Sequence, residues 1–291
     1  VKDATIKNLR TEGEIYGKTH YFSGLITEVY GKTAITGCVS NVNITSYYSG
    51  DRCAAAGMIS YIGSGANVTI TDCIVKGKFT ATTDNGKKYM GGFVCNQEGT
   101  CTLTNCLYIG KNNATDNSYT FADNATIKNC YFLDACGSKQ GEQVTADQLK
   151  NGEVAYKLQN SRNNTVWGLA FGSDAPQLTD NVEYRVYKVD FTYNNDVRAT
   201  RYATRNKHIY GSLPTVQEIL GTGYNPQHYY SGLTFADNFS GSTSVTADKQ
   251  VAVSFTHKVV CEIASKADWK EFCNLVNGGQ TKLNAKMTAN V

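Results

Sequence analysis

The sequence predicts a mainly β protein, in which a right-handed parallel β-helix (solenoid) with a capping helix is followed by a small β-grasp-like module. Composition gives the first indication, because only 18% of the residues are charged while the chain holds 27 Gly, 19 Tyr and only 3 Pro. Such a composition is typical of many short strands joined by polar turns. Two interleaved repeats give the other indications.

The first repeat places an apolar residue, a polar residue, a turn-forming residue and a cysteine in that order, as in "TITDCIVKG". It recurs at Cys38, Cys73, Cys106 and Cys130, at intervals of 35, 33 and 24 residues, and Leu9 takes the same place 29 residues before Cys38. The second repeat begins with a glycine, in "SGLIT", "AGMIS" and "GGFVC", at intervals of 33 and 35 residues. Units of this size must stack on one another to bury an apolar face.

Each repeat is predicted to be one coil of a parallel β-helix, since no helical period occurs before residue 140. Equivalent positions then lie above one another, so Cys38, Cys73, Cys106 and Cys130 form a structural ladder of small inward-facing side chains. The residue before each ladder position is expected at a corner with left-handed or bridge backbone. These corner residues are Asn8, Gly37, Asp72, Asn105 and Asn129, and a second corner is expected at Gly24, Gly57 and Gly92.

A metal site or a catalytic nucleophile is the less favoured interpretation of the ladder. Stacked cysteines point along a line, whereas zinc needs ligands that converge on one point, and the sequence has no CxxC pair. A nucleophile needs a base, and His20 is the only histidine before residue 200. Cys95 and Cys101 flank a short turn in "CNQEGTC", where two unpaired thiols are favoured over a hairpin disulfide.

The glycine and cysteine motifs of residues 3–136 resemble the GLUG-motif repeats of large surface proteins from gut-dwelling bacteria. This resemblance implies an extracellular or cell-surface β-helix, assigned here to residues 1–136, of a kind found in adhesin-like proteins and flanking certain peptidases. It implies no catalytic residue.

Residues 137–180 are predicted to form a capping helix and a strand. In "VTADQLKNGEVAYKLQN" the apolar residues fall on one face, and Thr145 with Gln148 has capping-box spacing. The helix is expected to cover the exposed end of the last coil, which would otherwise be open to aggregation. For Trp167, core packing is favoured over contact with a sugar.

Residues 181–257 resemble the Listeria-Bacteroides (internalin B-type) repeat, on the elements "YGSLP", "GY" and "TADKQVAV". The tryptophan usual in the central element of that family is absent, and "HYYSGLTF" stands in its place. The resemblance implies a β-grasp-like module that serves as a spacer or an interaction unit. Tyr224, Tyr229 and Tyr230 are predicted to offer a binding surface there, with strand packing as the favoured alternative.

Residues 258–291 are predicted to form a helix and a strand like the entry of a further β-helix unit. Ser265 and Asp268 suit a helix start, and Gly278 with Gly279 suits its end. Trp269 and Phe272 are expected to cover the open N-terminal end of a β-helix, either that of the same chain or that of a neighbouring molecule.

The predicted function is that of a non-catalytic, adhesin-like binding or scaffold module, within a fragment of a secreted or cell-surface bacterial protein. The net charge is +3 without basic runs, and no apolar run is long enough to span a bilayer, so neither nucleic-acid binding nor membrane insertion is predicted. No cofactor or metal is expected, and the expected partners are a host glycan or extracellular protein and the neighbouring modules of the chain. The alternatives are a carbohydrate-active β-helix enzyme, disfavoured because no pair of aspartates recurs at one ladder position, and a passive stalk or spacer in a tandem array.

Overall fold

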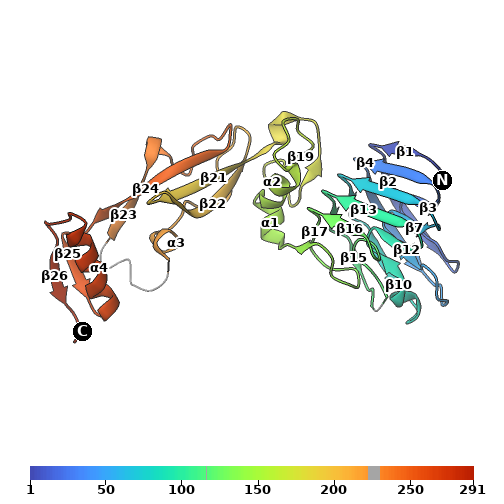
Figure 1. Cartoon of the computed structure of the whole chain (residues 1–291), viewed down its shortest axis with the longest axis horizontal. Helices are drawn as coiled ribbons and strands as arrows, with labels where there is room; N and C mark the ends of the chain where they lie inside the picture. The colour runs from blue at the N-terminus through green and yellow to red at the C-terminus, as the bar shows by residue number, and fades with distance from the viewer. Residues whose placement is uncertain (116, 222–229) are drawn as a thin grey trace. The chain divides into compact units, whose positions relative to one another are not determined.

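The computed structural model describes residues 1–115, 117–221 and 230–291. The chain divides into two compact units, Val1–Val182 and Glu183–Val291, each described below by itself. The first unit holds the segments predicted as β-helix and cap, and the second holds the β-grasp-like and C-terminal segments (Figure 1).

The first unit is a parallel β-solenoid, which confirms the predicted fold class. One face is a five-stranded sheet of β1 (Thr5–Lys7), β4 (Lys32–Thr36), β8 (Asn67–Thr71), β13 (Thr100–Thr104) and β16 (Thr126–Lys128). A second is an eight-stranded sheet of β2 (Arg10–Gly17), β5 (Val39–Ser46), β9 (Ile74–Val75), β10 (Lys78–Ala81), β14 (Leu107–Tyr108), β15 (Lys111–Asn112), β17 (Tyr131–Phe132) and β18 (Glu142–Gln143). The third consists of β3 (Ile26–Val29), β7 (Ile59–Ile62) and β12 (Val94–Gln97), next to the pair β6 (Ala55–Ala56) and β11 (Met90–Gly91). A short 3-10 turn, η1 (Gly86–Lys88), follows β10.

The four repeat cysteines lie in one buried row inside the solenoid, at the corner between the first two sheets. The Cys38 amide donates to the Cys73 sulfur at 3.4 Å, which shows that neighbouring thiols stack. Each thiol also donates to the carbonyl two residues earlier, at 3.2–3.5 Å. Cysteine therefore fills a narrow interior and gives a second donor to a strand-end carbonyl that already accepts from a corner amide of the preceding coil.

The five corner residues that precede this row have left-handed backbone, with φ from +50° to +68°. Asn and Asp tolerate this conformation, and Gly adopts it freely, which explains why the repeat alternates among these three residue types.

The three repeat glycines, Gly24, Gly57 and Gly92, form the glycine row, and the reason for glycine there is not the corner that the sequence suggested. Gly24, Gly57 and Gly92 are not among the positive-φ residues, so no left-handed corner requires them. Instead, a Cβ atom on Gly57 would lie 1.9 Å from the Gly92 carbonyl oxygen, and one on Gly92 would lie 2.2 Å from the Thr120 carbonyl oxygen. Glycine is needed here because the backbones of successive coils approach too closely for any side chain.

The cysteines are expected to react very unequally with a thiol reagent. Nine of the ten are buried and only Cys273 is half-buried, and burial raises the pKa of Cys101 and of Cys136 to about 12. We therefore expect the native protein to label rapidly at one thiol near neutral pH, and the Cys273→Ser variant to label at none. Unfolded protein should show ten thiols; a count of eight, ten minus two, would reveal a disulfide that the structure does not contain.

A helical layer packs on the flank of the solenoid, not on its end, so the expectation of an end cap is wrong. The layer contains α1 (Ala146–Lys150), α2 (Glu153–Gln159) and the hairpin of β19 (Trp167–Gly168) and β20 (Gln177–Leu178). Its core residues pack against an outward row of four apolar side chains from successive coils. This row, the flank row, is Val39, Ile74, Leu107 and Tyr131. The predicted capping box of Thr145 and Gln148 is present at the start of α1.

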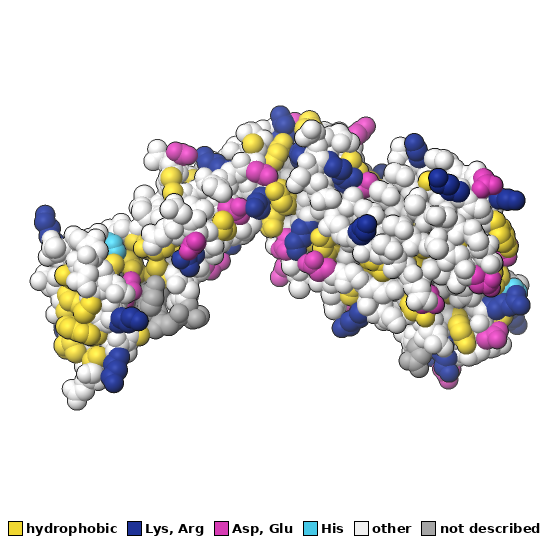
Figure 2. Space-filling model, viewed as in Figure 1, with side chains coloured by type: hydrophobic (Ala, Val, Ile, Leu, Met, Phe, Trp, Pro, Cys, Tyr) yellow, Lys and Arg dark blue, Asp and Glu magenta, His cyan; other side chains and the backbone are white. Residues whose placement is uncertain are grey.

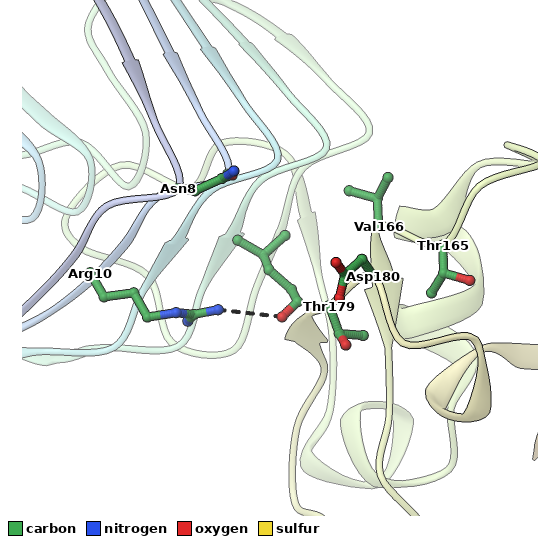
Figure 3. A pocket seen from close by; sticks show the side chains of 8 residues that line it. Asn8, Arg10, Thr165, Val166, Thr179 and Asp180 are labelled. Atoms are coloured by element: carbon green, nitrogen blue, oxygen red, sulfur yellow. Dashed lines mark hydrogen bonds between the residues drawn. The ribbon is translucent and has the colours of Figure 1, made fainter.

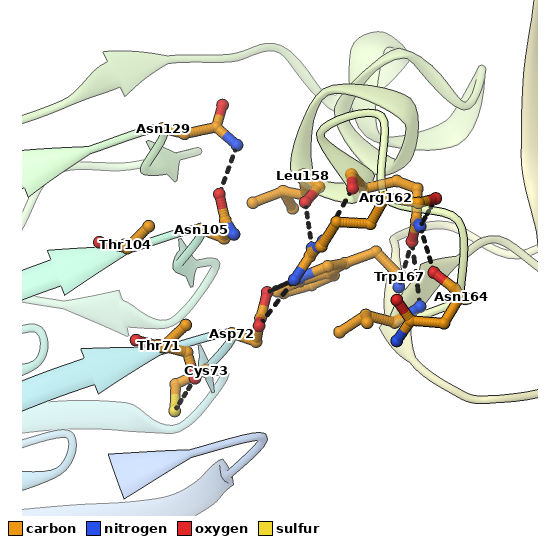
Figure 4. A network of polar contacts seen from close by, with 12 residues as sticks. Thr71, Asp72, Cys73, Thr104, Asn105, Asn129, Leu158, Arg162, Asn164 and Trp167 are labelled. Atoms are coloured by element: carbon orange, nitrogen blue, oxygen red, sulfur yellow. Dashed lines mark hydrogen bonds and ion pairs between the residues drawn. The ribbon is translucent and has the colours of Figure 1, made fainter. Parts of the chain in front are cut away.

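A buried polar contact fixes this layer to the solenoid corner (Figure 4). Arg162 Nη1 donates to both carboxylate oxygens of Asp72, at 2.9 and 2.8 Å, and Trp167 Nε1 donates to Asp72 Oδ1 at 2.8 Å. Trp167 is fully buried, which agrees with the core role favoured for it. Among the corner residues, only Asp72 is negatively charged, and this contact explains the exception.

The second unit contains a mixed four-stranded sheet in the order β22-β21-β24-β23 with a short helix, a β-grasp-like arrangement. In this sheet β24 runs parallel to β21, while the other two pairings are antiparallel. The elements in this part of the chain are, in order, η2 (Val182–Tyr184), β21 (Val186–Tyr193), β22 (Asp196–Thr204), α3 (Val216–Leu220), β23 (Tyr230–Phe235), η4 (Ala236–Asn238) and β24 (Lys249–His257).

The chain continues into β25 (Val260–Ile263), α4 (Lys266–Asn277) and β26 (Asn284–Met287), in which the two strands pair in parallel. The Ser265 hydroxyl accepts from the Asp268 amide at the start of α4, as predicted. Phe272 packs against Cys261 and Ile263, while Trp269 stays 47% exposed. Hydrophobic side chains gather on this part of the surface (Figure 2). That Trp269 and Phe272 cover the open end of a β-helix remains a prediction.

Candidate functional site

The site best suited to binding is a groove of roughly 350 Å³ on the solenoid, which we call the tyrosine groove. Four tyrosines, three amides and two carboxylates dominate its lining. The lining residues are Tyr21, Tyr61, Tyr89, Cys95, Asn96, Gln97, Glu98, Asn117, Tyr119 and Asp123.

Aromatic rings continue from the groove along the surface in an unbroken run. The Tyr21 and Tyr61 rings stack with centroids 5.7 Å apart and planes 19° apart. The Tyr30 ring follows Tyr61 at 6.5 Å, and on the other side the His20 ring lies 4.7 Å from Tyr21. Tyr48 lies 5.5 Å beyond His20. Such a run offers an extended amphipathic contact surface, with apolar ring faces and polar hydroxyl groups.

The parallel register of the solenoid builds part of this surface. Glu28 on β3 pairs with Tyr61 on β7, which in turn pairs with Asn96 on β12. The neighbouring Ile59 and Ile62 are buried, so their burial in the core holds the strand that carries Tyr61. A carboxylate, a phenol and an amide are thereby placed side by side on three successive coils.

Tyr21 is held in an unusual conformation above a small buried floor. Its φ is +66°, a left-handed value that is rare for a bulky residue, and its amide donates to the Cys53 carbonyl at 2.7 Å. The ring packs on a buried cluster of Cys53, Ala56 and Cys95. Backbone strain of this kind costs roughly 1–3 kcal/mol and persists only where the surroundings enforce it, often at functional sites.

Carboxylates fix the tyrosine hydroxyl groups. The Tyr30 hydroxyl donates to Glu28 Oε2 at 3.2 Å, and this bond is the main cause that raises the pKa of Tyr30. Interaction with the Glu98 carboxylate is the main cause that raises the pKa of Tyr61 to about 12. Burial, together with the nearby Asp123 carboxylate, raises the pKa of Tyr119. These phenols therefore stay neutral at physiological pH.

The groove also contains an acceptor that the protein itself leaves unused. The Gln97 Oε1 atom is buried and has no hydrogen-bond partner. Leaving a buried acceptor unsatisfied costs about 1–3 kcal/mol. Asn96 and Asn117 add amide groups that can both donate and accept.

A second, larger cavity of roughly 480 Å³ lies between the first solenoid corner and the β19–β20 hairpin (Figure 3). Asn8, Arg10, Thr165 and Asp180 are among its lining residues. Arg10 Nη2 donates to the Leu178 carbonyl at 3.4 Å across it. Arg10 thus bridges the solenoid and its flank layer, and the cavity has no aromatic lining.

Of the predicted tyrosine surface, Tyr230 is only 4% exposed, so it belongs to the core and not to a binding surface. Its hydroxyl donates to Glu271 Oε1 at 3.0 Å, and its ring packs on Phe255. Tyr224 and Tyr229 lie outside the described residues. Tyr230 therefore has a packing role in the sheet, which is the alternative that the sequence favoured.

The four repeat cysteines lie away from the tyrosine groove lining. The ladder thiols are buried inside the solenoid, and no group of three or more His, Cys, Asp or Glu residues within the described ranges could hold a metal ion. Cys95 and Cys101 are free thiols in different surroundings, one on the floor beneath Tyr21 and the other in the main core.

Sequence reasoning missed the tyrosine groove. Its tyrosines come from separate coils at unequal intervals, 40 residues from Tyr21 to Tyr61 and 58 from Tyr61 to Tyr119, so they follow no period. The alignment of the glycine motifs could have brought Glu28 and Tyr61 together, because each lies four residues after the glycine of its repeat.

Comparisons with known proteins name no family for this chain. No protein-family model matches it, and no curated protein matches it. A solved structure of similar shape is that of a "putative immunoglobulin A1 protease" from Bacteroides ovatus, with a TM-score of 0.46 and 14% identity. The match covers 61% of this chain and 58% of that protein. Within the described residues, no helix is both long and apolar enough to cross a membrane.

Proposed function

We propose that the chain is a non-catalytic, adhesin-like binding module of a secreted or cell-surface bacterial protein, and that its tyrosine groove binds a glycan. The run of aromatic rings bordered by amides and carboxylates is the observation that carries this proposal. Sugars present apolar C–H faces and a rim of hydroxyl groups, and both features match such a lining. The resemblance of the repeats to GLUG and Listeria-Bacteroides motifs of gut-bacterial surface proteins supports the location.

The supporting chemistry is that of a shallow, pre-formed contact surface. Tyrosine supplies a large rigid area with little loss of conformational entropy, and the amides supply adaptable hydrogen bonds. The carboxylates hold the phenols in place before a ligand arrives, which reduces the entropic cost of binding.

A binding measurement on a glycan array, followed by calorimetry with the strongest ligand, tests the proposal. We expect Tyr61→Ala to weaken binding about tenfold, which corresponds to about 1.4 kcal/mol, because it removes the centre of the ring run. Tyr16→Ala is the matched control, since Tyr16 is 76% exposed and does not line the groove. Equal losses in both variants, or no glycan ligand at all, would contradict the proposal, and the latter result would favour a passive stalk.

The second candidate function is a carbohydrate-active enzyme, favoured by the presence of two carboxylates in an aromatic groove. Glycoside hydrolysis uses a pair of carboxylates on either side of the scissile bond. Incubation of the bound glycan with the protein, followed by analysis of chain length, separates the two functions: cleavage that is lost in Glu98→Gln would replace the binding proposal with an enzymatic one.

A further inference from the structure

We propose that the tyrosine groove selects glycans that carry protonated amino groups, and that it discriminates against acidic glycans. This inference rests on the proposed function, because it names the class of glycan that the same groove would take. Three features of the groove carry it: the unused accepting capacity of two carboxylates, a local negative charge and the faces of half-buried aromatic rings.

Two lining carboxylates, Glu98 and Asp123, can only accept hydrogen bonds. The Glu98 carboxylate interacts with Tyr61 and the Asp123 carboxylate with Tyr119. An ionised carboxylate has about four lone-pair sites, so each retains unused accepting capacity. A ligand that brings donors can use this accepting capacity, and an ammonium group brings three.

The charge of the lining is negative although the whole chain is positive. Glu98 and Asp123 line the groove, and no Lys, Arg or His is among its described lining residues. Arg52 interacts with the Tyr21 hydroxyl at one end of the groove. Since the chain as a whole carries +3, a preference for cationic ligands would have to arise locally, in the groove.

The aromatic ring faces also favour a cationic ligand. A cation is attracted to the face of a tyrosine ring within about 6 Å of its centroid. An amino sugar can therefore place its ring over Tyr61 and its ammonium group between a ring face and a carboxylate. A uronic or sialic acid in the same place would set its carboxylate against Glu98 or Asp123, and no Lys, Arg or His is among the described lining residues to compensate this repulsion.

Calorimetry with three oligosaccharides of equal length tests this inference: oligomers of glucosamine, of N-acetylglucosamine and of galacturonic acid. We expect the glucosamine oligomer to bind at least tenfold more tightly than the N-acetylated one, and the galacturonate to bind most weakly. The advantage of the glucosamine oligomer should shrink in high salt, because salt screens the exposed charges.

The variant that isolates the cause is Glu98→Gln combined with Asp123→Asn. Both substitutions keep an oxygen that can accept the phenol proton, so the rings keep their places while the charge is lost. We expect the glucosamine and N-acetylglucosamine oligomers to bind this variant within twofold of each other. Asp84→Asn is the matched control, because it removes one negative charge from an exposed site of the same unit and should leave the preference unchanged.

Loss of the charge has an independent spectroscopic signature. Without the Glu98 charge, the pKa of Tyr61 should fall from about 12 toward the ordinary value of about 10, as measured by tyrosinate absorbance. If neutral and amino glycans bind the wild type equally, or acidic glycans bind best, this inference is overturned while glycan binding stands. If none of these glycans and none on the array binds, the proposed function fails and this inference fails with it.

Discussion

Replacing Asp72 with alanine is expected to lower the free energy of unfolding of the solenoid unit by about 3–5 kcal/mol, the usual cost of removing one partner of a buried ion pair. The Asp72 side chain is only 8% exposed, and it accepts from Arg162 and from the fully buried Trp167. Alanine would leave the guanidinium and the indole N–H without this acceptor. It would also place a residue with no tendency toward left-handed backbone at φ +51°.

Urea unfolding followed by the fluorescence of Trp167 measures this effect. The chain has two tryptophans, so a Trp269→Phe background makes the signal specific to the solenoid unit. Asp72→Asn is the informative control, because asparagine keeps the backbone preference and an acceptor for Trp167 but loses the charge. We expect the free energy of unfolding of Asp72→Asn to lie between those of the wild type and the alanine variant. An alanine variant as stable as the wild type would show that the flank layer does not depend on this contact.

Substituting Gly57 by alanine is expected to cost about 3 kcal/mol, at the upper end of the range for overpacked interiors. The new Cβ would lie 1.9 Å from the Gly92 carbonyl oxygen and 2.6 Å from Val75 Cγ1. The first of these atoms is backbone of the next coil, so it moves only if the coils separate and lose the hydrogen bond from the Gly57 amide to the Gly91 carbonyl.

Gly241→Ala is the control for this substitution, because nothing lies within 4 Å of a Cβ atom at that position. It should change the stability of the second unit by less than about 0.5 kcal/mol. The same thermal or urea denaturation, monitored by circular dichroism, measures both variants. Similar stability changes in Gly57→Ala and Gly241→Ala would mean that backbone flexibility, and not the approach of the coils, explains the glycine row.

The repeat motif was sufficient to predict the solenoid because a parallel coil ties each position to its counterpart one period away. A turn-forming residue followed by cysteine therefore indicated both the left-handed corner and the inward-facing side chain. The role of the glycines was not accessible in this way, since close approach and positive φ both select glycine, and only coordinates distinguish them.

The position of the helical layer was mispredicted although the sequence contained a signal for it. An amphipathic pattern shows that a helix buries one face, but it does not identify the surface against which that face packs. The signal was the residue after each cysteine: Val39, Ile74, Leu107 and Tyr131 are apolar, although they alternate with inward positions and must point outward. Apolar residues on both sides of a strand indicate that both sides are covered.

The candidate site was the least predictable part. Binding surfaces on a solenoid are built from outward positions, which the repeat does not constrain, and the tyrosines of the groove follow no interval. The predicted tyrosines of the second unit were clustered in sequence, but for Tyr230 the sheet and α4 required a packed ring. Clustering along a chain is a weak guide to exposure.

The flank layer has a consequence for how such a protein changes over evolutionary time. Solenoids commonly lengthen by duplication of a single unit, since each unit contacts only its neighbours. Here α1, α2 and the β19–β20 hairpin cover the flank row across four units at once. An inserted unit would expose one more apolar side chain beyond the reach of this layer, so the number of units and the length of the layer must change together.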